Sequence, residues 1–106
     1  MPDSRRPHEA LSALEGLLAL SEAMLDAARS GDWDTLVDQE AQRRALAATL
    51  PDDLASALPS AGQSAARRLI EACLRCDDRI QPLLAGRVDE LRVLLRAAPN
   101  TQHMSP

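Results

Sequence analysis

Hydrophobic residues recur every three or four positions over residues 8–30, while acidic residues take the opposite side. This spacing is typical of an amphipathic helix with a wide apolar face. The predicted inner face consists of Leu11, Leu14, Leu18, Ser21, Leu25 and Ala28, flanked by Leu17, Leu20, Met24 and Ala27.

The segment that follows has the residues that end one helix and begin another. Gly31 favours the left-handed conformation that closes a helix. Asp32 is a good N-cap, and Asp34 adds negative charge at the positive end of the next helix dipole. Because the connection is so short, the two helices are predicted to pack antiparallel as a hairpin.

A second helix is predicted over residues 33–50, where Pro51 stops it. Its inner positions are Trp33, Leu36, Val37, Glu40, Arg44, Ala47 and Leu50. Residues 51–62 are a connector, in which Pro51 and the acids after it favour one short helical turn.

A third helical pattern runs through residues 63–98 and contains Pro82 and Gly86. Proline in a helix removes one hydrogen bond and kinks it, so two interpretations remain: one bent helix, or a break near 82–86. Unbroken, this helix would be ~54 Å long against ~33 Å for the first. Its last turns would then extend beyond the hairpin and leave apolar side chains uncovered.

The fold class predicted is therefore all-α: an antiparallel bundle made of a hairpin and a long third helix. It forms one domain over residues 8–98, with a disordered leader at 1–7 and a flexible tail at 99–106. The candidate partner-binding residues are Leu83, Leu84, Val88, Leu91 and Leu95, together with Leu36 and Val37 of the second helix. Such an apolar strip is either a binding surface or a dimer seam.

The composition favours a protein partner over other ligands. The chain has 106 residues, a net charge of −4, one Trp, and no Phe or Tyr, so its core is aliphatic and thin. Its arginines are interleaved with acids, which argues against nucleic acid or an anionic membrane as ligand. Glutamates interrupt the first apolar stretch, so no signal peptide is predicted and a cytoplasmic location follows.

Few residues suggest catalysis or a cofactor. Cys73 and Cys76 form a CxxC in mid-helix, which is interpreted as core packing over a metal or redox pair, because a zinc site needs four ligands. His8 and His103 lie at the chain ends. No catalytic residue, metal site or cofactor is predicted, and the chain is not expected to be an enzyme.

Two charged positions and the tryptophan are assigned structural roles, together with Gly31 and Asp32. Glu40 lies on the inner face and needs a positive partner, either Arg44 or an arginine of the third helix. Asp77, on the stripe of the third helix, is expected to pair with an arginine. Trp33 is interpreted as an anchor of the hairpin, with a binding hot spot as the minor alternative.

Three segments together resemble the FliT-type flagellar export chaperones. They are the leucine-rich stretch 17–30 leading into Gly31-Asp32-Trp33-Asp34, the Glu40-Ala-Gln-Arg43-Arg44 motif, and the run Leu83-Leu84-Ala-Gly-Arg87-Val88-Asp89-Glu90-Leu91. The likeness covers residues 11–98 and lies in the order and spacing of these motifs.

The resemblance implies a cytosolic chaperone that binds the C-terminal region of the flagellar filament-cap protein, prevents its early assembly and delivers it for export. It further implies contacts with the export ATPase complex or export gate and, as a secondary role, with the flagellar master transcription regulator. Members of the family usually carry a further C-terminal helix with a docking tyrosine. That helix is not expected in this chain, so the substrate surface would be open. The alternative is a non-catalytic oligomerisation or adaptor module that forms a homodimer through its C-terminal helix.

Overall fold

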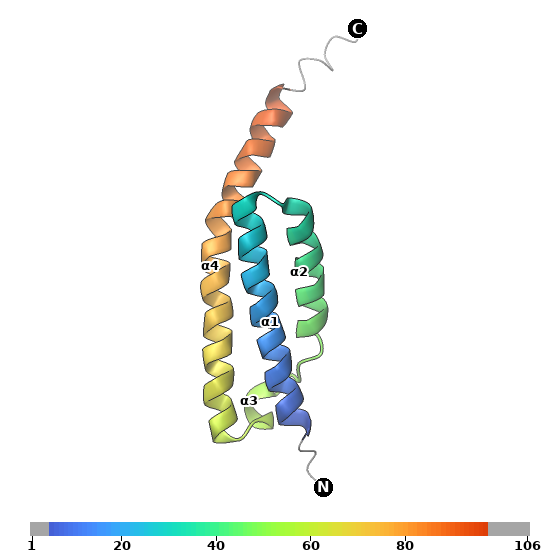
Figure 1. Ribbon diagram of the computed structural model, residues 1–106, viewed down its shortest axis with the longest axis vertical. Helices are drawn as coiled ribbons and strands as arrows, with labels where there is room; N and C mark the ends of the chain where they lie inside the picture. The colour runs from blue at the N-terminus through green and yellow to red at the C-terminus, as the bar shows by residue number, and fades with distance from the viewer. Residues whose placement is uncertain (1–4, 98–106) are drawn as a thin grey trace.

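The computed structural model describes residues 5–97, and the regular structure there is entirely helical. The chain forms α1 (Arg5–Ser30), α2 (Trp33–Ala47), the short α3 (Leu54–Ala57) and α4 (Ser60–Ala97). α1 lies in the middle, with α2 antiparallel to it on one side and α4 on the other side, running in the same direction as α1 (Figure 1). The predicted all-α helical bundle with an antiparallel hairpin is confirmed.

The helix bounds differ from the predicted ones by about one turn. α1 begins at Arg5, so residues 5–7 are helical and not part of a disordered leader. Pro7 is compatible with this because the first helical turn has no intrahelical use for its missing N–H. α2 ends at Ala47, three residues early, and α4 begins at Ser60. The rest of the predicted leader, residues 1–4, and the predicted tail lie outside the described residues.

The junction between α1 and α2 has the predicted chemistry. Gly31 has φ +74°, and the backbone N–H groups of Gly31 and Asp32 donate to the carbonyls of Ala28 and Ala27 at 3.2 and 2.8 Å. This pair of bonds is a Schellman closure of α1. The Asp32 carboxylate accepts from the backbone N–H of Thr35 at 3.3 Å and so caps α2.

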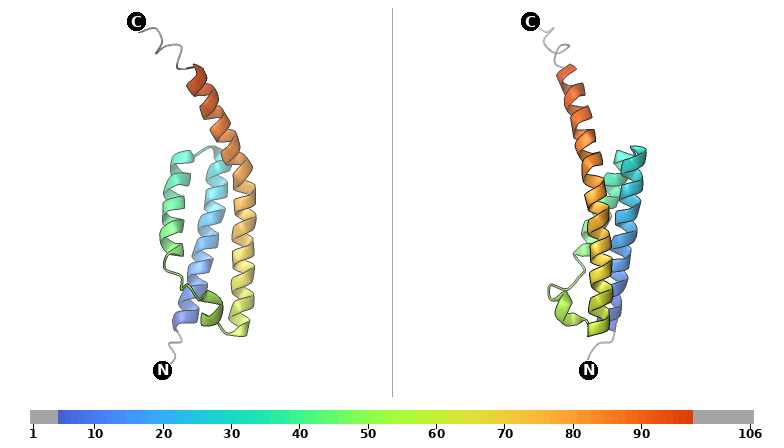
Figure 2. Two further views of the ribbon diagram at one scale, coloured as in Figure 1. Left: turned by 180° about the vertical axis from the view of Figure 1, so that it is seen from behind. Right: turned by 90° about the vertical axis from the view of Figure 1, so that its left-hand side faces the viewer.

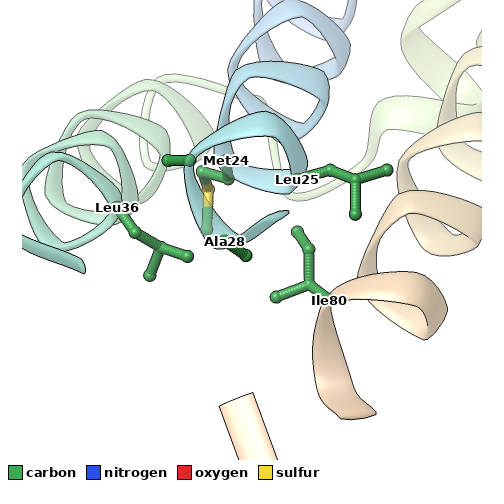
Figure 3. Packing of buried hydrophobic residues seen from close by; sticks show 6 residues of the cluster. Met24, Leu25, Ala28, Leu36 and Ile80 are labelled. Atoms are coloured by element: carbon green, nitrogen blue, oxygen red, sulfur yellow. The ribbon is translucent and has the colours of Figure 1, made fainter. Parts of the chain in front are cut away.

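Two apolar clusters hold the helices together, one towards each end of the hairpin. The upper cluster, of which Figure 3 shows six residues, lies near the α1–α2 junction, and the lower cluster lies near α3. The upper cluster contains Met24, Leu25, Ala27, Ala28, Leu36 and Ile80, with Trp33, Leu83 and Leu84 packed against it. The lower cluster contains Ala10, Leu14, Leu17, Leu58 and Ala66, with Leu11, Leu46, Leu50, Leu54, Leu69 and Cys73 packed against it.

The inner face of α2 is rotated from the predicted one. Val37 is 63% exposed, Ala47 is exposed, and the Arg44 side chain is 76% exposed, whereas that of Arg43 is only 23% exposed. The prediction that Val37, Arg44 and Ala47 point inward was therefore wrong. The shift follows from where α2 touches α1: Leu36 and Leu46 occupy the contact side, and these positions turn Arg43 inward with them.

α4 is one continuous helix that contains Pro82, which resolves the choice between a bend and a break. Its last turns lean away from the line of its first part and continue beyond the hairpin (Figures 1 and 2). Pro82 is exposed, and as a proline inside a helix it leaves one carbonyl of the preceding turn without its helical hydrogen bond. We call residues 88–97 the overhang; every residue in it is exposed.

Candidate protein-binding surface

The overhang carries an apolar strip that no other described part of the chain covers. Val88, Leu91 and Leu95 recur at helical spacing and are 43%, 41% and 66% exposed. They continue the line of Leu84, which is half-buried against the upper cluster. The strip, Val88, Leu91 and Leu95, thus begins where the core ends.

The predicted partner-binding residues divide into two groups. Leu83 and Leu84 pack against the upper cluster, and Leu36 is a buried member of it. Leu36 is therefore a core residue, and the prediction that it contacts a partner was wrong because α1 and α4 already cover it. Val37 is exposed on α2, on a different helix from the strip.

A second apolar surface, which sequence reasoning did not find, lies between α2 and α4. A groove of about 250 Å³ opens there, with α1 residues such as Leu14 and Leu17 at its base. Its further lining is mostly apolar: Ala47, Leu50, Leu54, Ile70, Cys73 and Leu74, with Ser21, Arg43 and Asp77 at the polar part. The groove exists because α1 packs against both outer helices while these barely meet each other (Figure 2). Ile70 is 38% exposed in this groove, although its helical spacing is the same as that of a core residue.

One polar cluster joins α2 to α4 across this groove. The Arg43 guanidinium donates to Asp77 Oδ1 at 2.7 Å, to Glu40 Oε2 at 2.9 Å and to the hydroxyl of the fully buried Ser21 at 3.2 Å. Burial alone would lower the pKa of Arg43, but the hydrogen bond and charge of Asp77, with those of Glu40, raise it above the ordinary value. Arg43 is thus a permanent cation.

Two expectations about this cluster can be compared with the structure. Asp77 pairs with an arginine, as predicted. Glu40 pairs with Arg44, one of the two partners predicted for it, and also with Arg43 of the same helix, while the pair between helices is made by Arg43. The charged residues in the middle of the α2 stripe were the sequence signal for this cluster. Arg44 was predicted to lie on the inner face, whereas in the structure the neighbouring Arg43 takes that position.

Trp33 links the hairpin to the base of the overhang. Its ring packs beside Leu83 and Leu84 against the upper cluster, and the Arg87 guanidinium lies 5.8 Å from the ring centroid. That distance is within the range of a cation–π contact. Trp33 therefore anchors α4 as well as the hairpin.

The cysteines are half-buried thiols. Cys73 packs against the lower cluster, in agreement with the core interpretation. Burial raises the pKa of both thiols above the ordinary value, which keeps them protonated and unreactive near neutral pH. Among residues 5–97, no three His, Cys, Asp or Glu side chains gather as metal ligands would. No helix there is both long and apolar enough to cross a membrane.

Comparison with known proteins gives one family. The model of the family described as "Flagellar protein FliT" matches residues 11–105. Proteins of that name from Cronobacter sakazakii and Photorhabdus laumondii are each 32% identical, over 94 and 93 residues. These matches cover 89% and 87% of this chain and 78% and 74% of the relatives. A third, from Citrobacter koseri, is 33% identical over 90% of this chain and 79% of the relative. No solved structure matches.

Proposed function

This chain belongs to the FliT family of flagellar proteins, and from that premise we propose that it is a cytoplasmic, non-catalytic export chaperone. Its cargo is the C-terminal region of the flagellar filament-cap protein. By binding that region it prevents premature assembly of the cap and delivers the subunit for export. Its proposed further partners are the export ATPase complex or export gate and, in a regulatory role, the flagellar master transcription regulator.

The observation that supports cargo binding is the strip of the overhang. Val88, Leu91 and Leu95 are exposed although the two core clusters are complete without them. Apolar side chains held in a row on a helix, outside the core, are a common docking surface for an amphipathic helix. We therefore place the cargo on the strip, with Leu83 and Leu84 at its base.

The test is isothermal titration of this protein with the C-terminal segment of the cap protein from the same organism. We expect binding in the micromolar range or tighter. No heat of binding, together with a stable dimer by light scattering, would reject the chaperone role and favour the oligomerisation module.

Substitutions locate the binding site within the overhang. Leu91→Asp and Leu95→Asp should abolish the titration while helicity by circular dichroism stays near that of the wild type, because neither side chain is in a core cluster. Val93→Asp is the matched control, because Val93 is 61% exposed and lies outside the line of the strip. Equal loss of binding in all three variants would mean that the strip is not the surface used.

A further inference from the structure

Arginines border both edges of the strip. At about 100° per residue, Arg87 lies about 40° beyond the Leu91 edge of the strip, and Arg92 lies about 40° beyond its Val88 edge. Arg96 lies about 40° farther round than Arg92, next to Asp89. The acids of this segment, Asp89 and Glu90, project farther round the helix, on the side turned away from the strip. The apolar surface is therefore framed by positive charge.

Arg92 and Arg96 are only weakly engaged within the chain, whereas Arg87 also lies over the Trp33 ring. Arg87 and Arg92 approach Glu90 and Asp89 at 3.4 and 3.7 Å, in pairs three residues apart whose acid side chains are exposed. Such pairs contribute only about 0.3 kcal/mol, so they are readily exchanged for a better partner. Arg96 forms no ion pair with any residue in the described range 5–97.

The end of α4 around the strip is less negative than the molecule as a whole. Residues 84–97 contain three arginines and two carboxylates, a net charge of +1, whereas the whole chain carries −4. Because the two carboxylates lie away from the strip, a negatively charged ligand is attracted to the edges of the strip. Charge of this kind selects the partner and its orientation more than it adds affinity.

We propose that the strip takes an amphipathic helix whose apolar face is bordered by aspartate and glutamate. This inference rests on the docking role proposed above and adds the chemistry of the ligand. A second copy of this chain fits less well. If two overhangs pair antiparallel, the side of the strip that carries Arg92 faces the same side of the other copy. If they pair parallel, the Arg92 side of one copy faces the Arg87 side of the other. Either arrangement brings arginine towards arginine, which is destabilising.

The probe is a pair of tryptophan-free synthetic helical peptides of about three heptads. Both have leucine at the heptad core positions; one has glutamate and the other lysine at the flanking positions. At low ionic strength we expect the dissociation constant of the glutamate peptide to be about tenfold lower than that of the lysine peptide. The difference between the two constants should shrink in about 0.5 M salt. Equal binding, or preference for the lysine peptide, would overturn the proposal.

Two triple variants test whether the arginines of residues 84–97 cause the preference. Arg87→Gln/Arg92→Gln/Arg96→Gln should bind both peptides alike. The control, Arg67→Gln/Arg68→Gln/Arg75→Gln, loses the same charge from exposed positions in the first half of α4 and should keep the preference. Leu91→Asp should abolish binding of both peptides. An equal effect of the two triple variants, or unchanged binding to Leu91→Asp, would place the preference elsewhere and reject the proposal.

Failure of this inference can be told apart from failure of the proposed function. If the cap-protein segment binds the wild type and the Arg87→Gln/Arg92→Gln/Arg96→Gln variant equally, the chaperone role stands and the acidic-ligand inference fails. If that segment does not bind but the glutamate peptide does, with the expected loss in Leu91→Asp, the cargo assignment fails and the inferred preference holds.

Discussion

Gly31 is the residue at which the chain reverses between α1 and α2. Its φ of +74° is unfavourable for any residue with a Cβ, although nothing lies within 4 Å of where that Cβ would be. Gly31→Ala should therefore lower the free energy of unfolding by about 1 kcal/mol through the backbone alone, measured by urea unfolding.

Gly86 provides the matched control for Gly31. Its Cβ would also meet nothing within 4 Å, but it lies inside α4 with helical backbone. Gly86→Ala should leave stability unchanged or raise it by up to about 1 kcal/mol, because alanine is the better helix former. If both substitutions destabilise the protein alike, backbone strain at Gly31 is not the cause.

The thiols of Cys73 and Cys76 should make the protein sensitive to alkaline pH. Burial is the main reason that the pKa of each is raised, and for Cys73 a hydrogen bond with Ser21 opposes it only in part. The folded chain thus holds these protons more tightly than the unfolded chain. The stability that the folded chain gains from holding these protons is fully present below the ordinary thiol pKa. It is lost as pH rises through the raised pKa of the folded state.

This chain has neither Lys nor Tyr, so the two thiols are the only side chains that titrate between about pH 8 and 11. Urea unfolding should therefore give a lower stability at about pH 10 than at pH 7. The Cys73→Ser/Cys76→Ser variant should show a clearly smaller decrease. If that variant loses as much stability between pH 7 and about pH 10 as the wild type does, groups other than the two thiols cause the loss.

The contact between α2 and α4 depends on the ion pair of Arg43 with Asp77. A double-mutant cycle with Arg43→Ala and Asp77→Ala should give a coupling free energy of about 1 kcal/mol, because Arg43 is largely shielded from water. The same cycle on Arg44 and Glu40, whose pair lies at the surface, should give less than about 0.5 kcal/mol. Equal coupling free energies would mean that the ion pair across the groove stabilises the fold no more than an exposed pair within one helix.

The helices and their order could be predicted because they follow from local signals. Periodic leucines, the Gly31–Asp32 junction and Pro51 each act within a few residues. The rotation of α2 could not be predicted in the same way. Val37 and Arg44 fit a helical stripe as well as Leu36 and Arg43 do, and only the packing of Leu36 and Leu46 against α1 decides between them.

The candidate site was predictable in part for the same reason. The strip at Val88, Leu91 and Leu95 follows from the length of α4 compared with α1, a property of the sequence. The groove between α2 and α4 does not, since it depends on how far apart two helices stand that contact a third. Residues such as Ile70 and Leu74 have the same pattern whether they line a groove or fill a core.

The whole molecule has a gradient of order along α4. Cys73, Ile80, Leu83 and Leu84 fasten residues 73–84 to the two clusters, whereas no residue of the overhang belongs to or packs against either cluster. Amide hydrogens of 88–97 should exchange about a hundredfold faster than those of 73–84, measured by mass spectrometry. A bound cargo should slow exchange in the overhang; uniform protection along α4 without cargo would contradict this gradient.

The position of the overhang also affects how the protein can be switched off. The overhang contains Arg92 and Arg96 in about three exposed helical turns, and trypsin-like proteases cut after arginine. A cut at Arg92 removes Leu95 but leaves both core clusters intact. Limited digestion should therefore leave a bundle that melts as before and no longer docks. If the proposed function is correct, a single proteolytic cut would abolish cargo binding without unfolding the protein.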